Sequence, residues 1–418
     1  MQSDPVLEAF DRLRLRKVDY HRTASKASKM MAEFQFAAAS LEPDEKIKLV
    51  IYMHDSMTLL KAVLAHPQAN KICSLRWDYS GEEDVDSIIP LLLNNCPELA
   101  SLEVNFEYYS EFDFLSSVLE HPSNKIKALE TPKYAEGDFA RFFAALEQSQ
   151  VSALALYYSP EFAQGLNEYL ARDLLVRFMV WGYNQVLPEL LMSLSKCTRL
   201  AKLEMLYCEF SQPTAFTHLP KSITKLRLYD CTFGGGFDWS FLAGSNVRKL
   251  DFDHMKEVDG NQFGGALAAY LRAKGLDELC LRDRSFADEA LAAAGVEIGR
   301  IKRLDLSYIT LDNASLELIA LVLQSPNSEM KELTLWYDGS TASSIEGHLV
   351  SALRHPNCNL AKLSLQADQH REAAGRVEDM FHNHRALFVL LQGRQVRRQY
   401  CPLRRLPVEM FRLVGKML

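Results

Sequence analysis

A short phrase of alternating apolar positions recurs twelve times between residues 72 and 365. Its form is apolar-x-x-Leu-x-apolar, as in ICSLRW from Ile72 and LAKLSL from Leu360. Alternation with a period of two predicts a short strand at each copy. The central residues are spaced by 23 to 30 positions and are Leu75, Leu102, Leu129, Leu154, Phe178, Leu203, Leu226, Leu250, Leu279, Leu304, Leu333 and Leu363.

The segments between these phrases have apolar residues at intervals of three and four, as in NASLELIALVLQS from Asn313. This spacing predicts a helix after most strands. Several segments reach a proline shortly before the next phrase, as at His66-Pro67 and His355-Pro356, and proline disfavours helix for the residue before it. In the third copy Thr131-Pro132 predicts a short or distorted strand, because proline cannot donate to a strand ladder.

The repeated phrase resembles the leucine-rich repeat, and its length and helical segments are similar to the ribonuclease-inhibitor-like class. The resemblance implies an α/β solenoid of about twelve repeats, with a parallel sheet on the concave side of a horseshoe and helices on the convex side. It also implies that Cys208 and Cys231, at a position where the family has a buried Asn or Cys, are core thiols.

The flanks of the array are expected to act as caps, because terminal repeats would otherwise expose their core. We expect a helical N-terminal cap at 1–66, with Ser40 capping a helix, and the repeat array at 67–370. A helical C-terminal cap with a basic tail is expected at 371–418. No linker rich in Gly, Ser and Pro separates either flank from the array.

Residues beside the inward-pointing leucines are expected on the concave face, where they form two aromatic patches with an acidic cluster between them. Tyr and Trp bury a large area while losing few rotatable bonds, and carboxylates suit a basic partner. The predicted partner-binding residues are Tyr157, Tyr158, Trp181, Tyr207, Tyr229, Asp230, Asp251, Asp253, Asp305, Tyr308, Trp336 and Tyr337, with Asp283 also near the cluster. The alternative is that some of these aromatic side chains cover the rim of the core.

Catalytic and metal-binding motifs are not apparent in the sequence. Cys280 is the one thiol expected on the concave face, with Asp283 and His254 near it, but no oxyanion donor is apparent. His382 and His384 are not spaced as two ligands on one helix face, so no metal or other cofactor is expected. The run of three glycines from Gly234 lacks a phosphate-binding pattern and indicates a loop.

Composition and charge narrow the classes of partner. The formal net charge is −7, which argues against nucleic acid, although residues 394–418 hold seven basic residues and one acid. Eight cysteines without a CxxC pair indicate reduced thiols. The charged N-terminus and the lack of a long apolar run predict a cytoplasmic protein with no leader and no membrane partner. A monomer is also expected, although the sequence does not determine the oligomeric state.

The C-terminal phrase Leu406-Pro407-Val408-Glu409-Met410 is similar to the opening of F-box helices, and its place in the chain is similar to the end of a SOCS box. The expected function is non-enzymatic recognition of a protein partner on the concave face. The alternatives are a substrate-recognition adaptor of a ubiquitin ligase, a pathogen effector that binds a host protein, and a regulator of a small GTPase or nuclease.

Overall fold

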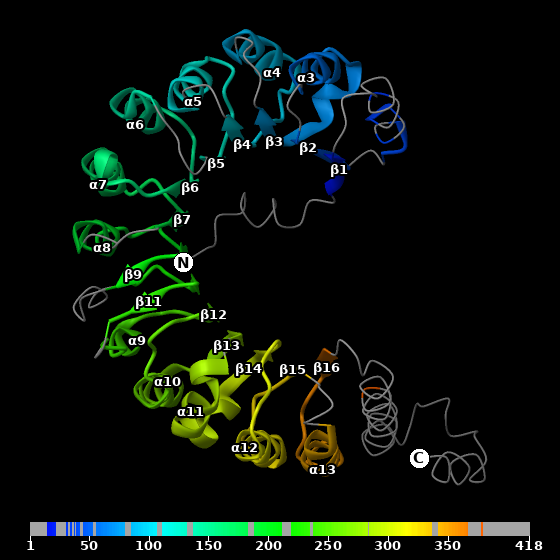
Figure 1. Cartoon of the computed structure of the whole chain (residues 1–418), viewed down its shortest axis with the longest axis vertical. Coiled ribbons are helices and arrows are strands. Elements are labelled where there is room, and N and C mark those ends of the chain that lie inside the picture. The colour runs from blue at the N-terminus through cyan, green and yellow to red at the C-terminus, as the bar shows by residue number, and fades with distance from the viewer. Residues whose placement is uncertain are drawn as a thin grey trace, which may run out of the picture. The chain divides into compact units, whose positions relative to one another are not determined.

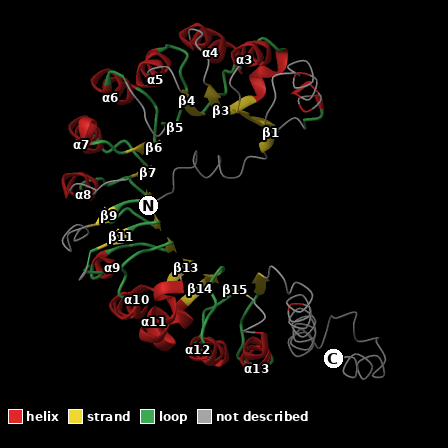
Figure 2. Cartoon of the chain, viewed as in Figure 1, coloured by secondary structure: helices red, strands yellow, loops and turns green. Residues whose placement is uncertain are grey.

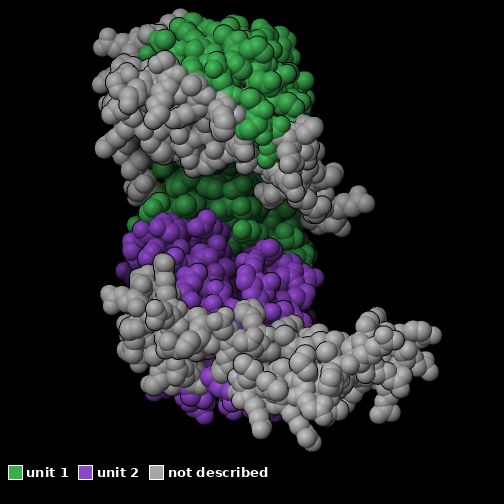
Figure 3. Space-filling model, turned by 90° about the vertical axis from the view of Figure 1, so that its right-hand side faces the viewer, with its two compact units in different colours: residues 1–226, 244–246 green, residues 227–243, 247–418 purple. Residues whose placement is uncertain are grey.

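The structure is a computed structural model, and it places most of the repeat array. It describes residues 15–21, 31, 34–35, 37, 39–41, 45–52, 56–79, 85–106, 111–131, 137–182, 188–210, 219–234, 237–282, 284–336, 342–366 and 378. The chain divides into two compact units, which Figure 3 shows in green and purple. The first unit comprises 1–226 with 244–246, and the second comprises 227–243 with 247–418.

The first unit alternates parallel strands with helices (Figure 1). Its described helices are α3 (Ser56–Leu64), α4 (Ile89–Asn95), α5 (Glu111–Glu120), α6 (Phe139–Gln148), α7 (Ala163–Ala171) and α8 (Pro188–Ser195). Its strands are β1 (Leu15–His21), β2 (Lys46–Tyr52), β3 (Ile72–Tyr79), β4 (Ser101–Phe106), β5 (Ala128–Glu130), β6 (Ala153–Tyr157), β7 (Arg177–Trp181), β8 (Lys202–Leu206) and the two-residue β9 (Glu209–Phe210).

The second unit has the same alternation (Figure 2). Its described helices are α9 (Phe241–Gly244), α10 (Gly260–Lys274), α11 (Arg284–Ala294), α12 (Asn313–Gln324) and α13 (Ala342–Leu353). Its strands are β10 (Lys225–Tyr229), which contains the division between the units, β11 (Thr232–Phe233), β12 (Lys249–Asp253), β13 (Leu276–Arg282), β14 (Ile301–Leu306), β15 (Glu332–Trp336) and β16 (Lys362–Gln366).

The predicted central residues stand directly beside one another in neighbouring strands. Leu129 pairs with both Leu102 and Leu154, and Leu304 pairs with both Leu279 and Leu333. Phe178 keeps the same register although it replaces the usual leucine. The array is therefore an α/β leucine-rich repeat solenoid, as the periodicity predicted.

The core of each unit lies between the sheet and its helices. The central residues are at most 2% exposed, because every second strand residue points toward the helix layer. Cys208 and Cys231 are also buried, and each thiol donates to the carbonyl oxygen two residues earlier, at 3.4 Å. The expectation that these two cysteines are core thiols is confirmed.

Two features of the first unit depart from the regular repeat, and only one of them was expected. β5 has only three residues, as Thr131-Pro132 predicted. The expectation of a helical cap at 1–66 was wrong for 15–21 and 46–52, where β1 and β2 lie and pair in parallel, and β2 pairs with β3. The Ser40 hydroxyl donates to the carbonyl oxygen of Ala37, three residues earlier.

An aromatic cluster fills the second unit near the loop that was expected at Gly234. Trp239 is 2% exposed, and its ring centroid lies 4.8 Å from Phe237, 4.9 Å from Phe263 and 5.1 Å from Phe233. Here α9 has only four residues, so large rings occupy the space that a longer helix would fill.

Candidate protein-binding surface

Each unit has one sheet face that no described helix covers, and we call it the open sheet face (Figure 1). Strand residues that alternate with the buried leucines point to this side. In β7, for example, Phe178 and Val180 are buried, whereas Arg177, Met179 and Trp181 are partly exposed. The open sheet face therefore displays the strand residues beside the buried leucines, which the sequence analysis expected on the concave side.

Tyr157 and Trp181 form a stacked pair on the open sheet face of the first unit. Their ring centroids are 4.7 Å apart and their planes differ by 12°. The two residues pair directly across β6 and β7, and both are partly exposed. Stacking orders both rings, so a partner would lose less side-chain entropy when it binds them.

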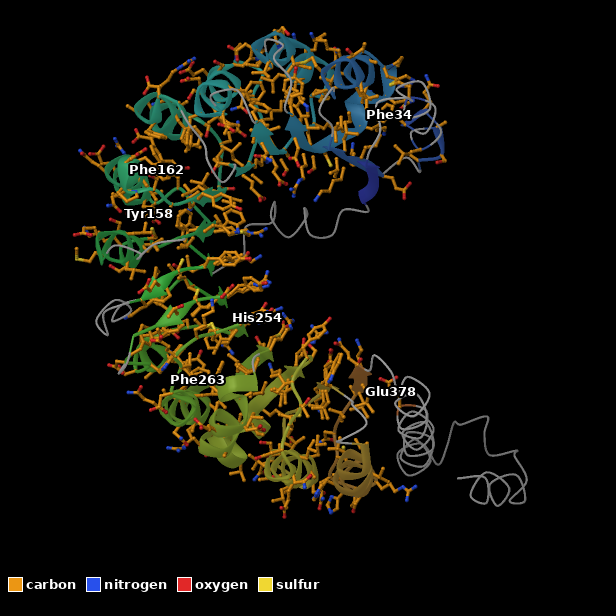
Figure 4. The ribbon with its side chains drawn as sticks, in the orientation of Figure 1. Phe34, Tyr158, Phe162, His254, Phe263 and Glu378 are labelled. Atoms are coloured by element: carbon orange, nitrogen blue, oxygen red, sulfur yellow. The ribbon has the colours of Figure 1, made fainter. Side chains whose placement is uncertain are left out.

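Tyr158 does not belong to this exposed pair. It is 9% exposed and packs edge-on against Phe162, with 6.2 Å between the ring centroids (Figure 4). Burial raises the pKa of its phenol to about 12. The alternative reading, in which some aromatic side chains cover the rim of the core, therefore describes Tyr158 better than partner binding does.

Four predicted or neighbouring residues, each four positions after the central leucine of its repeat, have left-handed backbone. They are Tyr207, Asp230, His254 and Tyr308, with φ between 49° and 67°. Non-glycine residues seldom adopt this conformation. Because it recurs at the same position in four repeats, the turn is a repeated feature of the array. Within this turn the side chain of Tyr308 is 68% exposed, whereas that of Tyr207 is only partly exposed.

Further aromatic contacts lie on the open sheet face of the second unit. The Tyr229 ring meets the His254 ring edge-on at 5.7 Å, and the Arg227 guanidinium lies 5.8 Å from the Tyr229 centroid. The Tyr308 and Trp336 rings are 5.4 Å apart. The Tyr308–Trp336 contact joins two residues that the sequence assigned to the same aromatic patch.

The acidic cluster of the second unit encloses an arginine. Arg282 lies 3.2 Å from a carboxylate oxygen of Asp251, 3.2 Å from one of Asp305 and 3.7 Å from one of Asp253. Its Nε also donates to the hydroxyl of Ser307 at 3.3 Å. We call these four charged residues, Arg282 with its three aspartates, the Arg282 network.

Other cations also contact this acidic cluster. Arg227 lies 3.5 Å from Asp251, and Lys256 pairs with Asp230 at 2.5 Å. Arg282 was not among the residues predicted from the sequence to bind a partner, although strand alternation places it on the same face. The signal available in the sequence was that Arg282 lies on β13, between the strands that carry Asp251 and Asp305.

A second charged array, on the first unit, was not selected from the sequence. Arg76 pairs with Glu103 at 2.6 Å, and Glu103 stands directly beside Glu130 in the next strand. Burial, together with the Glu130 carboxylate, raises the pKa of Glu103 to about 7. Burial also raises the pKa of Glu130 and of Asp78. The signal for this array was a glutamate in one column of two adjacent repeats.

Cys280 is not arranged as a nucleophile. Its side chain points to the open sheet face but is 3% exposed beneath the Arg282 network, and burial raises its thiol pKa. The thiol's described hydrogen-bond contact is the carboxylate of Glu278 at 3.8 Å. A thiol must ionise to attack, and this environment favours the protonated form.

Several predicted sites lie outside the described residues. These are Asp283, Tyr337, the His382 and His384 pair, and the 394–418 tail on which the ligase-adaptor alternative rests. Within the part of the chain that the structure places, no group of three or more metal-ligating side chains comes together. None of the described helices is long and apolar enough to span a bilayer.

Comparison with known proteins finds similarity to solved structures but to no family model or curated sequence. No family model matches the chain, and no curated protein matches its sequence. Among solved structures, an internalin from Listeria monocytogenes has 11% identity and a TM-score of 0.39, over 82% of this chain and 96% of that one. The Rad7 and Elc1 complex from yeast has 12% identity and a TM-score of 0.41, over 82% of this chain and 85% of that one. Scores this low identify neither a family nor a function.

Proposed function

We propose that this protein is a non-enzymatic scaffold that binds a protein partner on its open sheet face. The observation that carries the proposal is the stacked Tyr157–Trp181 pair, which is ordered, partly exposed and free of any described helix above it. Ordered aromatic side chains are the residues that most often dominate binding energy at protein interfaces. The exposed Tyr308 beside Trp336 supports a second contact region on the second unit.

The proposal includes several finer statements about the protein. We infer a ribonuclease-inhibitor-like repeat class, supported by helices of 7 to 15 residues after most strands. We also infer a monomer in the cytoplasm, without nucleic acid or membrane as partner. The net charge of −7 and the free thiols of the seven described cysteines support a reducing compartment and a protein ligand.

The test is affinity purification from an extract of the source cells, followed by mass spectrometry. Wild type is compared with a Tyr157→Ala/Trp181→Ala variant and with Met192→Ala, in which a 58% exposed apolar side chain of α8 on the helix layer is removed. We expect at least one protein to be lost with the double variant and retained with Met192→Ala. An identical set of proteins from all three, with equal thermal stability, would contradict recognition by this face.

A further inference from the structure

The open sheet face of the first unit carries an apolar strip across three adjacent strands. The strip comprises Ala155 and Tyr157 of β6, Met179 and Trp181 of β7, and Leu206 of β8. Ala155 pairs with Met179, Tyr157 with Trp181, and Trp181 with Leu206. All but Ala155 are partly exposed. An apolar surface built from neighbouring side chains on ordered strands is suited to holding an apolar group of a partner.

A carboxylate with no described ion partner borders this strip. Glu130 pairs in the sheet with Ala155 on one side and with Glu103 on the other. Glu103 has Arg76 at 2.6 Å, whereas Glu130 has no hydrogen bond or ion pair among the residues that the structure places. Two carboxylates therefore stand side by side, and among the described residues one cation, Arg76, contacts one of them, Glu103.

The other open-face carboxylates that the structure describes nearby are matched by cations within the fold. Glu204, two strands beyond Ala155, contacts both Arg177 at 3.0 Å and Lys202 at 2.5 Å. In the second unit the three aspartates of the Arg282 network share Arg282. At Glu130, therefore, a carboxylate without a cation partner among the described residues adjoins the apolar strip.

We propose that β4 to β8 form a binding site for a basic, partly apolar segment of the partner, in which a Lys or Arg pairs with Glu130 and Glu103 while an apolar or aromatic side chain lies on the Tyr157–Trp181 pair. This inference rests on the proposed function and names the chemistry of its ligand. Charge complementarity selects the occupant, because an acidic or neutral segment would leave Glu130 without a counter-ion in a half-buried position.

The strand geometry also sets the spacing within the ligand. Glu130 lies one strand from Tyr157 and two strands from Trp181, and both rings lie two residues further along their strands. With strands about 4.8 Å apart and about 3.3 Å per residue, the carboxylate lies roughly 8 to 12 Å from the two rings. Side chains on the same side of an extended segment are two or four residues apart, about 7 or about 13 Å, and these two spacings bracket that separation.

The carboxylates make this binding sensitive to pH near neutrality. Burial raises the pKa of Glu103 to about 7 and raises that of Glu130, so part of the site is protonated below neutral pH. A cation binds the ionised form, and its affinity therefore increases as pH rises. The charged groups that act on the two carboxylates from their own and neighbouring strands are Lys48, Arg76, Asp78, Arg177 and Glu204.

The experiment uses the full chain and a random library of 12-residue peptides displayed on phage, selected at pH 8. We expect enriched peptides to carry Lys or Arg two or four positions from an aromatic or large aliphatic residue, the spacings that place both side chains on one side of an extended segment. For the best synthetic peptide, titration should show a roughly tenfold loss of affinity in Glu130→Gln, as for a truncated interfacial charge pair. Affinity should rise up to about tenfold between pH 6 and pH 8, by linkage to carboxylate ionisation.

Asp305→Asn is the matched control, because Asp305 is already paired with Arg282 in the second unit, and it should leave peptide affinity unchanged. Selection of peptides without cations, or no enrichment, would overturn the inference. So would equal affinity for wild type and Glu130→Gln.

The outcomes also separate this inference from the proposed function. If peptides lose binding in Tyr157→Ala/Trp181→Ala but not in Glu130→Gln, recognition by the open sheet face stands and the basic-ligand inference fails. Peptides that bind equally well to that double variant would contradict both. Glu103→Gln provides a second variant in case Glu130→Gln fails to fold, and it should weaken binding in the same direction.

Discussion

The open sheet faces of the two units use similar residues with different electrostatic results. In the second unit, Arg282 lies between carboxylates on both neighbouring strands and pairs with all three. In the first unit, Glu103 and Glu130 lie side by side, and burial raises the pKa of both. In a repeat sheet, the charged residues on the adjacent strands decide whether an acidic side chain is paired within the fold: Arg282 reaches Asp251 and Asp305 from two residues further along its own strand.

The largest expected effect comes from removing the cation of the second unit. Arg282→Met should lower the free energy of unfolding by about 3 kcal/mol at pH 7.5, because three partly buried carboxylates lose their shared counter-charge. Urea unfolding followed by circular dichroism measures this.

Arg303→Met is the control for that substitution. Arg303 pairs with Glu332 at 2.6 Å, but its side chain is 44% exposed, so we expect a loss under about 1 kcal/mol. Equal losses from the two variants would show that the Arg282 network is no more important to stability than an exposed pair.

The helix layers of the two units offer a second contrast. A Cβ on Gly264 of α10 would overlap the backbone of α11 at Ala290, whereas one on Gly165 of α7 would meet the side chain of Phe143 at 2.7 Å. A ring can shift but a helix backbone cannot move alone. Gly264→Ala should therefore cost about 2 kcal/mol in urea unfolding, and Gly165→Ala less.

Gly265→Ala is the matched control for Gly264→Ala, because nothing lies within 4 Å of the added methyl group. It should be neutral or stabilising by up to about 1 kcal/mol, as alanine is the better helix former. A large loss from this variant would assign the effect of Gly264→Ala to helix propensity or backbone change and not to contact with α11.

A smaller effect concerns the pH dependence of stability in the first unit. The folded pKa of Glu103, about 7, lies above its ordinary value of 4.5. Its contribution to stability is therefore complete below pH 4.5 and is lost as pH rises toward 7. Glu103→Gln should flatten the unfolding free energy over this range by about 1 kcal/mol, the full shift being reduced by solvent screening. Glu103→Asp, which keeps a carboxyl group there, should retain the slope.

The smallest effect is a difference in thiol reactivity. Burial raises the thiol pKa of Cys280, which is 3% exposed, whereas Cys358 is partly exposed. Iodoacetamide at pH 7.5, with peptide mass spectrometry to assign the sites, should label Cys358 faster than Cys280. Rapid labelling of Cys280 in the folded protein would revive the nucleophile hypothesis.

Local sequence was sufficient for the features that a single repeat specifies. The period of two predicted the strands around the central leucines, and Thr131-Pro132 predicted the short β5. The same approach missed β2, although Ile47, Leu49 and Ile51 alternate and Leu49 lies one repeat length before Leu75. A short apolar run beside a helical pattern is ambiguous when read without its neighbours.

The sequence by itself therefore determined the fold class and the face on which the residues of the twelve recurring strands lie, because burial of alternate side chains is a local, periodic requirement. Tertiary structure alone decided which charges meet. Arg282 and Asp305 are 23 residues apart in sequence, yet their side chains are 3.2 Å apart on adjacent strands. Pairing across strands depends on register and rotamer. These decide that the three aspartates of the Arg282 network share a cation, whereas Glu130 has no ion pair among the described residues and lies beside an apolar strip.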